Sequence, residues 1–339
     1  MSNISVVIPL YNKKPYIERA ILSALRQTIE NFELIVIDDG STDGGDEVVK
    51  SIKDHRVKLV RQENQGASGA RNRGIELARG RLIAFLDADD AWKPEYLEEI
   101  MVLHQLFPEA GAFATAYEFI DIDGSLGVPI FNFLPPGKIR GLFPFFCQGA
   151  LAQEGMTASS VVVRKNVFEK LGGFKLGESK DEHRDMWLRI VLHYPVAWSN
   201  RSLVIIYSNT NDRQMIKRKR HYLREPAVSK TARQAIASGA LTADQVVMLR
   251  EYVAYYQIMA AHHCLRLGRK REALKILEYA EGTGWYKKKW RWYWTLLAKL
   301  PFNLFPKYEK IKKLESTFRK KYLKKIPISY ETEKNGKKT

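Results

Sequence analysis

The first 110 residues alternate between short apolar runs and longer segments with helical spacing, which limits the folds open to the chain. The apolar runs cover residues 4–11, 32–38, 57–61 and 81–87, and the helical segments cover 15–27, 43–53, 66–78 and 94–107. Apolar strands that alternate with helices are typical of a parallel sheet covered on both faces. The sequence therefore predicts an α/β fold with a mostly parallel central sheet, in which ligands bind at the carboxyl edge of the strands.

The pattern becomes less regular after residue 110 and turns helical after residue 210. Strands are predicted over residues 111–120 and 159–168, and a helix over residues 185–195. A closing strand or pair of strands is predicted over 197–209, and a loop near the binding crevice over 131–146. Two helices with a turn at 267–269 follow. We therefore predict a first domain over residues 1–210, a helical accessory region over 211–325 and a disordered tail over 326–339.

The net charge of +17 is concentrated in the second part of the chain. Residues 1–210 contain 24 Lys and Arg against 27 Asp and Glu, whereas residues 211–339 contain 31 against 11. Within the basic part, residues 284–325 combine Lys and Arg with Trp and Tyr, which suits an anionic membrane surface. The alternative is that these aromatic side chains pack on the first domain while the lysines are solvated.

Cysteine content and hydropathy limit the location of the protein. The two cysteines, Cys147 and Cys264, indicate neither a disulfide framework nor a structural zinc site. The first residues lack the layout of a signal peptide, and no window approaches the length of an uncharged transmembrane segment. We expect a cytoplasmic protein, with a peripheral position at the inner face of the membrane as an option.

Carboxylates follow two of the predicted strands directly. Asp38 and Asp39 end the second strand, and Asp87, Asp89 and Asp90 follow the fourth. A turn and helix start would explain the residues after Asp39 but not the pair itself. Neighbouring carboxylates raise one another's pKa unless a cation is present, and Mg²⁺ or Mn²⁺ binds to one or two carboxylates together with substrate phosphates. The loops therefore favour a site for a metal-bound phosphate.

Four linked motifs resemble the family 2 glycosyltransferases of the GT-A fold. These motifs are SVVIPLYN, FELIVIDDGSTD, NQGASGARNRG and FLDADDAW. The resemblance implies that Asp89 belongs to a D-x-D motif that ties Mn²⁺ or Mg²⁺ to a diphosphate. It also implies a nucleotide site, in which we include Pro9, Tyr11, Asp38, Asp39, Arg71 and Asp87. Asp39 would hold the base or ribose, and Asp87 would contact the ribose.

The family's catalytic base lies between a G-G-F turn and a D-[LM]-W-L-R helix. Here LGGF covers residues 171–174 and DMWLRI covers 185–190. Strict register aligns Glu182 with a family Glu and His183 with the base, although family precedent favours a carboxylate. Asp181, Glu182 and His183 therefore all stay candidates, with helix capping as the structural alternative.

The resemblance implies an inverting transferase that moves a single sugar from a nucleotide-diphosphate sugar, UDP by family habit, to an acceptor hydroxyl. The acceptor would be a lipid-linked or surface-polysaccharide precursor. The Q-x-x-R-W motif of processive relatives is absent. The alternatives are a degenerate nucleotide-sugar-binding protein and a nucleotidyltransferase. Nucleic-acid binding is not expected, because it would leave the acidic loops unexplained.

Overall fold

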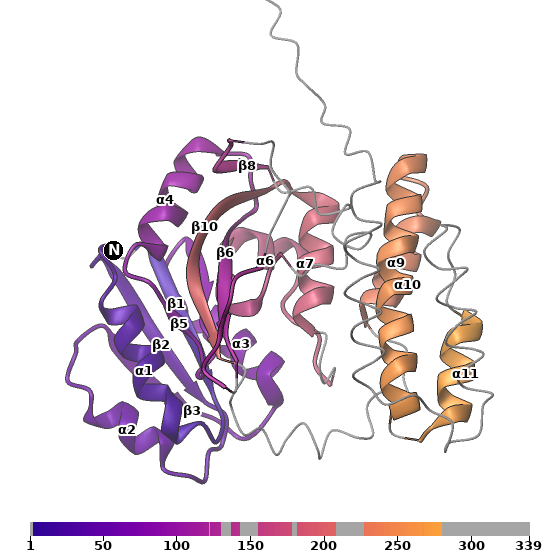
Figure 1. Cartoon of the computed structure of the whole chain (residues 1–339). Helices are drawn as coiled ribbons and strands as arrows, with labels where there is room; N and C mark the ends of the chain where they lie inside the picture. Colours follow the sequence, from indigo (N-terminus) through magenta and orange to yellow (C-terminus); the bar gives the residue numbers. More distant parts are fainter. Residues whose placement is uncertain are drawn as a thin grey trace, which may run out of the picture.

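The computed structural model of the chain describes residues 3–121, 123–129, 137–142, 155–177, 182–207, 227–266 and 268–279. In this part of the chain ten strands form one sheet, with the order β3-β2-β1-β4-β9-β6-β10-β5, while β7 pairs with β6 and β8 with β10. Figure 1 shows the sheet with helices packed on its faces. The predicted α/β class is confirmed.

One half of the sheet is entirely parallel. It consists of β1 (Ile4–Leu10), β2 (Phe32–Asp38), β3 (Val57–Arg61) and β4 (Leu82–Phe85). In this half β1 pairs with both β2 and β4, and β2 pairs with β3. Every residue of β2 is buried, as expected for a strand whose two faces are covered by helices. The carboxyl ends of these strands share one edge, where the acidic loops begin.

The other half is mixed in direction. It contains β9 (Val161–Arg164), β6 (Ala112–Ile120), β10 (Val196–Tyr207), β5 (Ala91–Trp92), β7 (Leu126–Gly127) and β8 (Arg140–Leu142). Strand β9 runs antiparallel to both β4 and β6 and joins the two halves. Strand β10 is a single long strand parallel to β6, with register shifts after Ser199 and Ser202.

Two expectations for this half are corrected. The strand predicted over residues 159–168 covers only Val161–Arg164, and helix α6 (Lys165–Leu171) follows directly. The strand stops because Arg164 pairs with Leu82, the first residue of β4, and no partner lies beyond it. The loop predicted over 131–146 contains strand β8, which pairs with β10, and the rest of that loop lies outside the described residues.

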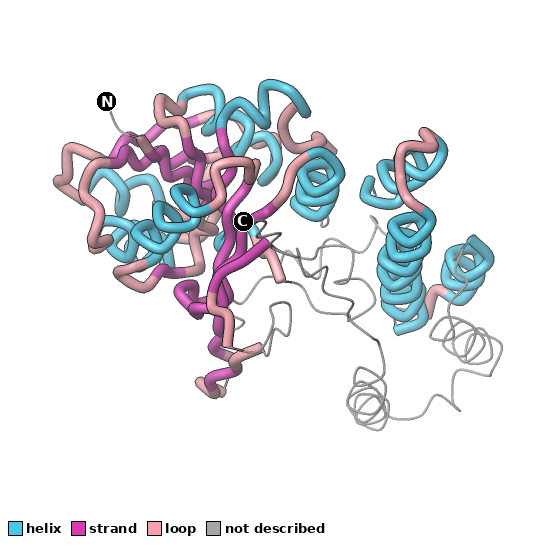
Figure 2. The backbone as a smooth tube through the Cα atoms, turned by 90° about the horizontal axis from the view of Figure 1, so that it is seen from above, coloured by secondary structure: helices cyan, strands magenta, loops and turns pink. Residues whose placement is uncertain are grey.

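Helices cover both faces of the sheet. On one face lie α1 (Lys14–Leu25), α2 (Gly45–Ser51) and α4 (Tyr96–Leu106), and on the other α3 (Gly66–Leu77), α6 and α7 (Glu182–His193). Alternate residues of β1 serve the two cores, because Val6 and Ile8 pack with α1 whereas Val7 packs with α3. In Figure 2 the strands (magenta) are seen from above, with helices (cyan) around them.

The C-terminal helices extend the second layer. They are α9 (Ala227–Ala237), α10 (Ala243–Arg266) and α11 (Lys270–Tyr279). Helix α9 packs on α7, α10 on α9, and α11 on α10 (Figure 1). The predicted pair of helices with a turn near Gly268 is confirmed. No helix among the described residues is long and apolar enough to span a bilayer. The predicted boundary at residue 210, the basic segment 284–325 and the tail 326–339 lie outside the described residues.

Candidate functional site

The turns after β1 and β2 are joined at the carboxyl edge of the sheet. The Asn12 backbone N–H donates to Ser41 Oγ at 3.1 Å, and Asn12 Oδ1 accepts from the Thr42 N–H at 2.8 Å. Asn12 has a φ of 51°, a left-handed conformation that Asn tolerates better than most residues. Pro9 is the penultimate residue of β1 and Tyr11 follows the strand, so both lie at the same edge as the acidic loop of β2.

Asp38 is completely buried and stabilises the turn that follows it. Its Oδ1 accepts a hydrogen bond from the Ser41 N–H at 2.9 Å, and its Oδ2 lies 3.1 Å from the Arg61 guanidinium. A buried carboxylate needs such partners to offset its desolvation. In this structure Asp38 therefore builds the loop on which Asp39 sits, and its part in nucleotide binding stays a prediction.

Asp39 lies at the N-terminus of helix α3. Its carboxylate accepts from Gln62 Nε2 at 2.7 Å and from the backbone N–H groups of Gln65 and Gly66 at 2.9 and 2.8 Å. The first N–H groups of a helix have no partner within the helix, and the helix dipole favours a negative charge there. Asp39 thus fixes the start of α3 against the end of β2, at the position predicted for a nucleoside contact.

Helix α3 carries Arg71 toward the second acidic loop. Gly74 allows the helix to lie close to β1, because a Cβ at this position would be 2.2 Å from Val7 Cγ1. The Arg71 side chain is 4% exposed, and its guanidinium donates to Asp87 Oδ1 at 2.7 Å and lies 5.5 Å from the Phe174 ring centre. Arg71 therefore connects the two loops that the sequence analysis predicts for the nucleotide.

The neighbouring Asn72 connects α3 to the G-G-F turn. Its Nδ2 donates to the Phe174 carbonyl at 2.9 Å, and its Oδ1 accepts from the Phe174 N–H at 2.8 Å. Both backbone groups of one residue in the turn are thereby satisfied by a single side chain. Helix α3, whose start is fixed by Asp39, is thus also fixed to the turn that precedes the candidate base.

The loop after β4 contains three carboxylates in different surroundings. The Asp87 side chain is 35% exposed, whereas Asp90 is buried and accepts from Ser159 Oγ at 2.5 Å. Burial raises the pKa of Asp90 well above its usual range, and the nearby charges of Asp87 and Asp89 raise it further. Ser159 also accepts from the Asp87 N–H at 3.1 Å. Asp90 therefore shapes the loop, while the side chains of Asp87 and Asp89 stay partly exposed.

Asp89 is paired with a lysine from the turn after β1. Its Oδ2 lies 2.6 Å from Lys13 Nζ, and both side chains are 19% exposed. The backbone carbonyl of Asp89 accepts from Arg19 Nη2 at 2.5 Å, and the Arg19 guanidinium lies 3.4 Å from the Tyr207 ring centre. The D-x-D loop is consequently fixed by Lys13 from the turn after β1 and by Arg19 of α1, whose guanidinium also contacts the end of β10.

Asp87 and Asp89 are partly exposed and suit a metal ion that is shared with a phosphate ligand. Among the described residues there is no group of three or more His, Cys, Asp or Glu side chains that could hold a metal by themselves. Asp87 and Asp89 each use one oxygen in an ion pair and keep the other. Mg²⁺ commonly binds to one or two carboxylates plus substrate phosphates, so this oxygen donor set fits that arrangement.

The candidate base residues lie at the start of helix α7. Glu182 is the first residue of the helix and His183 the second, and the side chain of His183 is half-buried. Asp181 lies outside the described residues. The structure thus places Glu182 and His183 on one helical turn without selecting between the candidates.

Three supporting residues were not predicted from the sequence. Lys13 lies in the turn after β1 and Asn72 is next to Arg71 in the sequence, so their positions in or beside the motifs offered a signal. Ser159 offered none, because it lies 69 residues from Asp90 and meets it only through the placement of β9.

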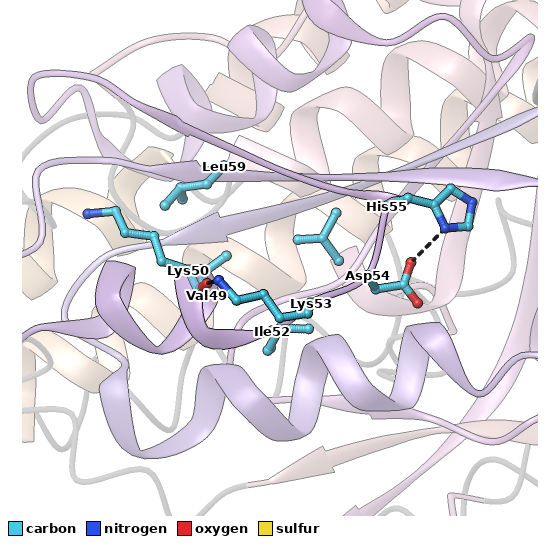
Figure 3. A pocket seen from close by; sticks show the side chains of 8 residues that line it. Val49, Lys50, Ile52, Lys53, Asp54, His55 and Leu59 are labelled. Atoms are coloured by element: carbon cyan, nitrogen blue, oxygen red, sulfur yellow. Dashed lines mark hydrogen bonds and ion pairs between the residues drawn. The ribbon is translucent and has the colours of Figure 1, made fainter.

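A separate groove of about 380 Å³ lies near the amino end of β3, away from the acidic loops. Figure 3 shows the side chains from α2 and the following turn that line it. The groove's carboxylate, Asp54, already accepts from Arg56, whose hydrogen bonds lower the pKa of Asp54 to about 2. Nothing in this groove resembles the donor set at the carboxyl edge.

Comparisons with known proteins agree with this geometry. Residues 5–153 match the model of glycosyl transferase family 2. An uncharacterized glycosyltransferase of Nostoc sp. is 39% identical over 125 residues, which is 36% of this chain and 38% of the relative. TuaG of Bacillus subtilis, named for a teichuronic acid biosynthesis glycosyltransferase, is 40% identical over 126 residues, which is 36% of this chain and 49% of the relative. The chain thus spans less than half the length of either relative.

The same fold occurs in a solved structure. Staphylococcus aureus TarS, residues 1–349, crystallised with UDP-GlcNAc, superposes with a TM-score of 0.67 at 17% identity and covers 82% of this chain and 80% of that one. This likeness confirms the predicted GT-A fold. The family match covers the part of the chain that carries the acidic loops, since residues 5–153 match the model of glycosyl transferase family 2.

Proposed function

We propose that the protein transfers a single sugar from a nucleotide-diphosphate sugar to an acceptor hydroxyl. The observation that carries this proposal is the meeting of Asp39, Arg71, Asp87 and Asp89 at the carboxyl edge of four parallel strands. The relatives that are named as glycosyltransferases support the reaction class. The complex of TarS with UDP-GlcNAc supports UDP as the nucleotide.

The donor would bind across the acidic loops. Tyr11 and Pro9 would line the nucleotide pocket, and Asp39 would accept a hydrogen bond from the base or ribose. Arg71 would hold Asp87 against the ribose through the ion pair at 2.7 Å. Because this guanidinium is nearly buried, its orientation is set by the fold before any ligand arrives. Such preorganisation lowers the cost of ordering side chains on binding.

A divalent ion, Mn²⁺ or Mg²⁺, would be held by Asp89, with Asp87 as the neighbouring carboxylate. When bound, the ion would neutralise charge on the departing diphosphate. Lys13 adds a positive charge at the same place, 2.6 Å from Asp89. This side of the crevice therefore has the charge that a diphosphate leaving group requires.

Inversion requires a base on the opposite side of the sugar from the diphosphate. The first turn of α7 would supply it, because the G-G-F turn before this helix is fixed to α3 through Asn72. Glu182 or Asp181 would accept the proton from the acceptor hydroxyl as a carboxylate. A neutral His183 is the alternative, since imidazole accepts protons near neutral pH.

The acceptor is proposed to be a precursor of a surface polysaccharide, because TuaG is named for teichuronic acid biosynthesis. A lipid-linked acceptor would fit the basic and aromatic segment 284–325 if that segment contacts an anionic membrane surface. Removal of residues 284–339 would then reduce binding to anionic liposomes without changing nucleotide binding.

The test is a calorimetric panel of UDP, GDP and dTDP, each with Mn²⁺ and with a chelator, followed by release of UDP from UDP-sugars in the presence of acceptors. Metal-dependent binding of one nucleotide with turnover supports the proposal. Binding without turnover for any sugar and acceptor favours the degenerate nucleotide-sugar-binding protein. Release of pyrophosphate from a nucleoside triphosphate and a sugar phosphate would favour the nucleotidyltransferase.

A further inference from the structure

A partly buried ionic cluster joins helix α7 to the C-terminal helix α9, with the Asp185 side chain inaccessible and the Lys175 side chain 41% exposed. At its centre is Asp185, which is completely buried and lies on the first turn of α7 after the candidate base residues. Its Oδ1 accepts from Lys175 Nζ at 2.9 Å and from Thr231 Oγ1 at 2.5 Å. Lys175 Nζ also donates to Thr231 Oγ1 at 2.9 Å, so these three residues form a closed set.

The second oxygen of Asp185 connects the cluster to the G-G-F turn. Oδ2 accepts from Arg189 Nε at 2.9 Å. The remaining nitrogens of Arg189 donate to the carbonyls of Leu171 and Gly173 at 2.8 and 2.7 Å. One buried carboxylate thus fixes α7 both to the turn before it and to α9.

The cluster could have a purely structural role or a role in positioning the site. A buried carboxylate with two cations and a hydroxyl could serve only to attach α9, and apolar contacts already do this, since Val228 and Ala232 lie in the same core as Trp187. A buried charge is an expensive means of attachment compared with apolar packing. Its position matters more, because Asp185 is less than one turn of 3.6 residues from Glu182 and His183.

We propose that Thr231, Lys175 and Asp185 position the first turn of α7 for sugar transfer, so that the C-terminal helical region completes the acceptor side of the site. This inference rests on the proposed function. Thr231 is a positioning residue that acts through Asp185, and it lies far from the donor-side loops in the chain. Its loss is expected to change turnover while leaving donor binding unchanged.

The experiment compares Thr231→Val, which keeps the shape but loses the hydroxyl, with Thr231→Ser, which keeps the hydroxyl. We expect Thr231→Val to lower kcat by about tenfold, the effect of one hydrogen bond, with the KM for the donor unchanged, and Thr231→Ser to restore it. The control is Thr242→Val, which removes the exposed hydroxyl that accepts from the Gln245 N–H at the start of α10. This variant should destabilise the helical region without changing kcat.

A second measurement does not depend on turnover. The amide N–H groups of residues 186–188 close the first turn of α7, so their hydrogen exchange reports its order. Exchange should be about tenfold faster in Thr231→Val and unchanged in Thr231→Ser and Thr242→Val. Wild-type exchange in Thr231→Val, or an equal loss of kcat in Thr242→Val, would overturn the proposal. If the wild type transfers no sugar, the proposed function fails, and the exchange data alone decide whether the cluster positions the turn.

Discussion

The proposed donor side and the proposed acceptor side of the site are held in different ways. On the donor side, Asp39 fixes α3, Arg71 pairs with Asp87, and Lys13 pairs with Asp89, all within the first 90 residues. On the acceptor side, the first turn of α7 is fixed through contacts that reach residue 231. The donor side is a local structure within a family-matched segment, whereas the acceptor side is assembled from distant parts of the chain.

The largest effect is expected from a substitution in the acidic loop on the proposed donor side. Asp89→Asn keeps the size of the side chain and removes its charge. We expect transfer to fall by about 10²–10³-fold, as for the loss of one group that stabilises a developing charge. The affinity for UDP, measured by calorimetry, should also no longer depend on Mn²⁺. The matched control is Asp123→Asn, an exposed turn residue that accepts from the Ser125 N–H. An Asp89→Asn variant with metal-dependent UDP binding would remove Asp89 from the metal site.

The ion pairs that join α4 to β8 and β10 can be tested by varying the pH. Burial alone would raise the pKa of Glu99, but hydrogen bonds from Arg140 and Arg201 outweigh it and lower the value from 4.5 to about 2. A depressed carboxyl pKa stabilises the fold above the unfolded value and loses this effect as pH falls through the folded value. Glu99→Gln should therefore lower the free energy of unfolding by up to about 3 kcal/mol near neutral pH.

Urea titrations of Glu99→Gln at a series of pH values provide the measurement. The difference from the wild type should be constant above pH 4.5 and shrink toward pH 2. Glu98→Gln, on the same helix but with an exposed contact to Thr28, should show no comparable difference. A pH-independent difference would mean that packing rather than charge accounts for the loss.

Asn72 tests the connection between α3 and the G-G-F turn. Asn72→Ala leaves both backbone groups of Phe174 without this partner, so we expect a loss of about 1–3 kcal/mol in stability. Because the turn precedes the candidate base, kcat should fall more than nucleotide affinity. Thermal unfolding and UDP calorimetry measure the two effects, with the exposed Asn31→Ala as control. Equal losses of kcat and affinity would contradict this separation.

The smallest effect is expected at Arg71. Arg71→Lys keeps the charge but loses the planar guanidinium that reaches Asp87, so nucleotide affinity should fall by about tenfold. Arg73→Lys, two residues on, changes an exposed pair with Glu76 and should leave affinity unchanged. Similar affinities for both variants would show that the geometry of Arg71 does not matter for the donor.

The ease of predicting each side follows from how it is held. The parallel strands and the positions of Asp39, Asp87 and Asp89 at one edge could be predicted, because strand periodicity and topology alone bring them there. The roles of Ser159 and Asp185 could not, because their partners lie 69 and 46 residues away and depend on β9 and α9. The strand predicted beyond Arg164 was wrong because the length of its neighbour β4, rather than its own composition, ends it.

The Lys13–Asp89 pair has a consequence for the order in which ligands bind. Without a donor this carboxylate is already paired with an ammonium group, so a divalent ion that arrives alone must bind beside that positive charge and gains little. A diphosphate brings enough negative charge for both cations, and binding of the divalent ion then becomes favourable. We therefore expect weak affinity for Mn²⁺ alone, strong mutual enhancement with the nucleotide, and binding that weakens as ionic strength rises.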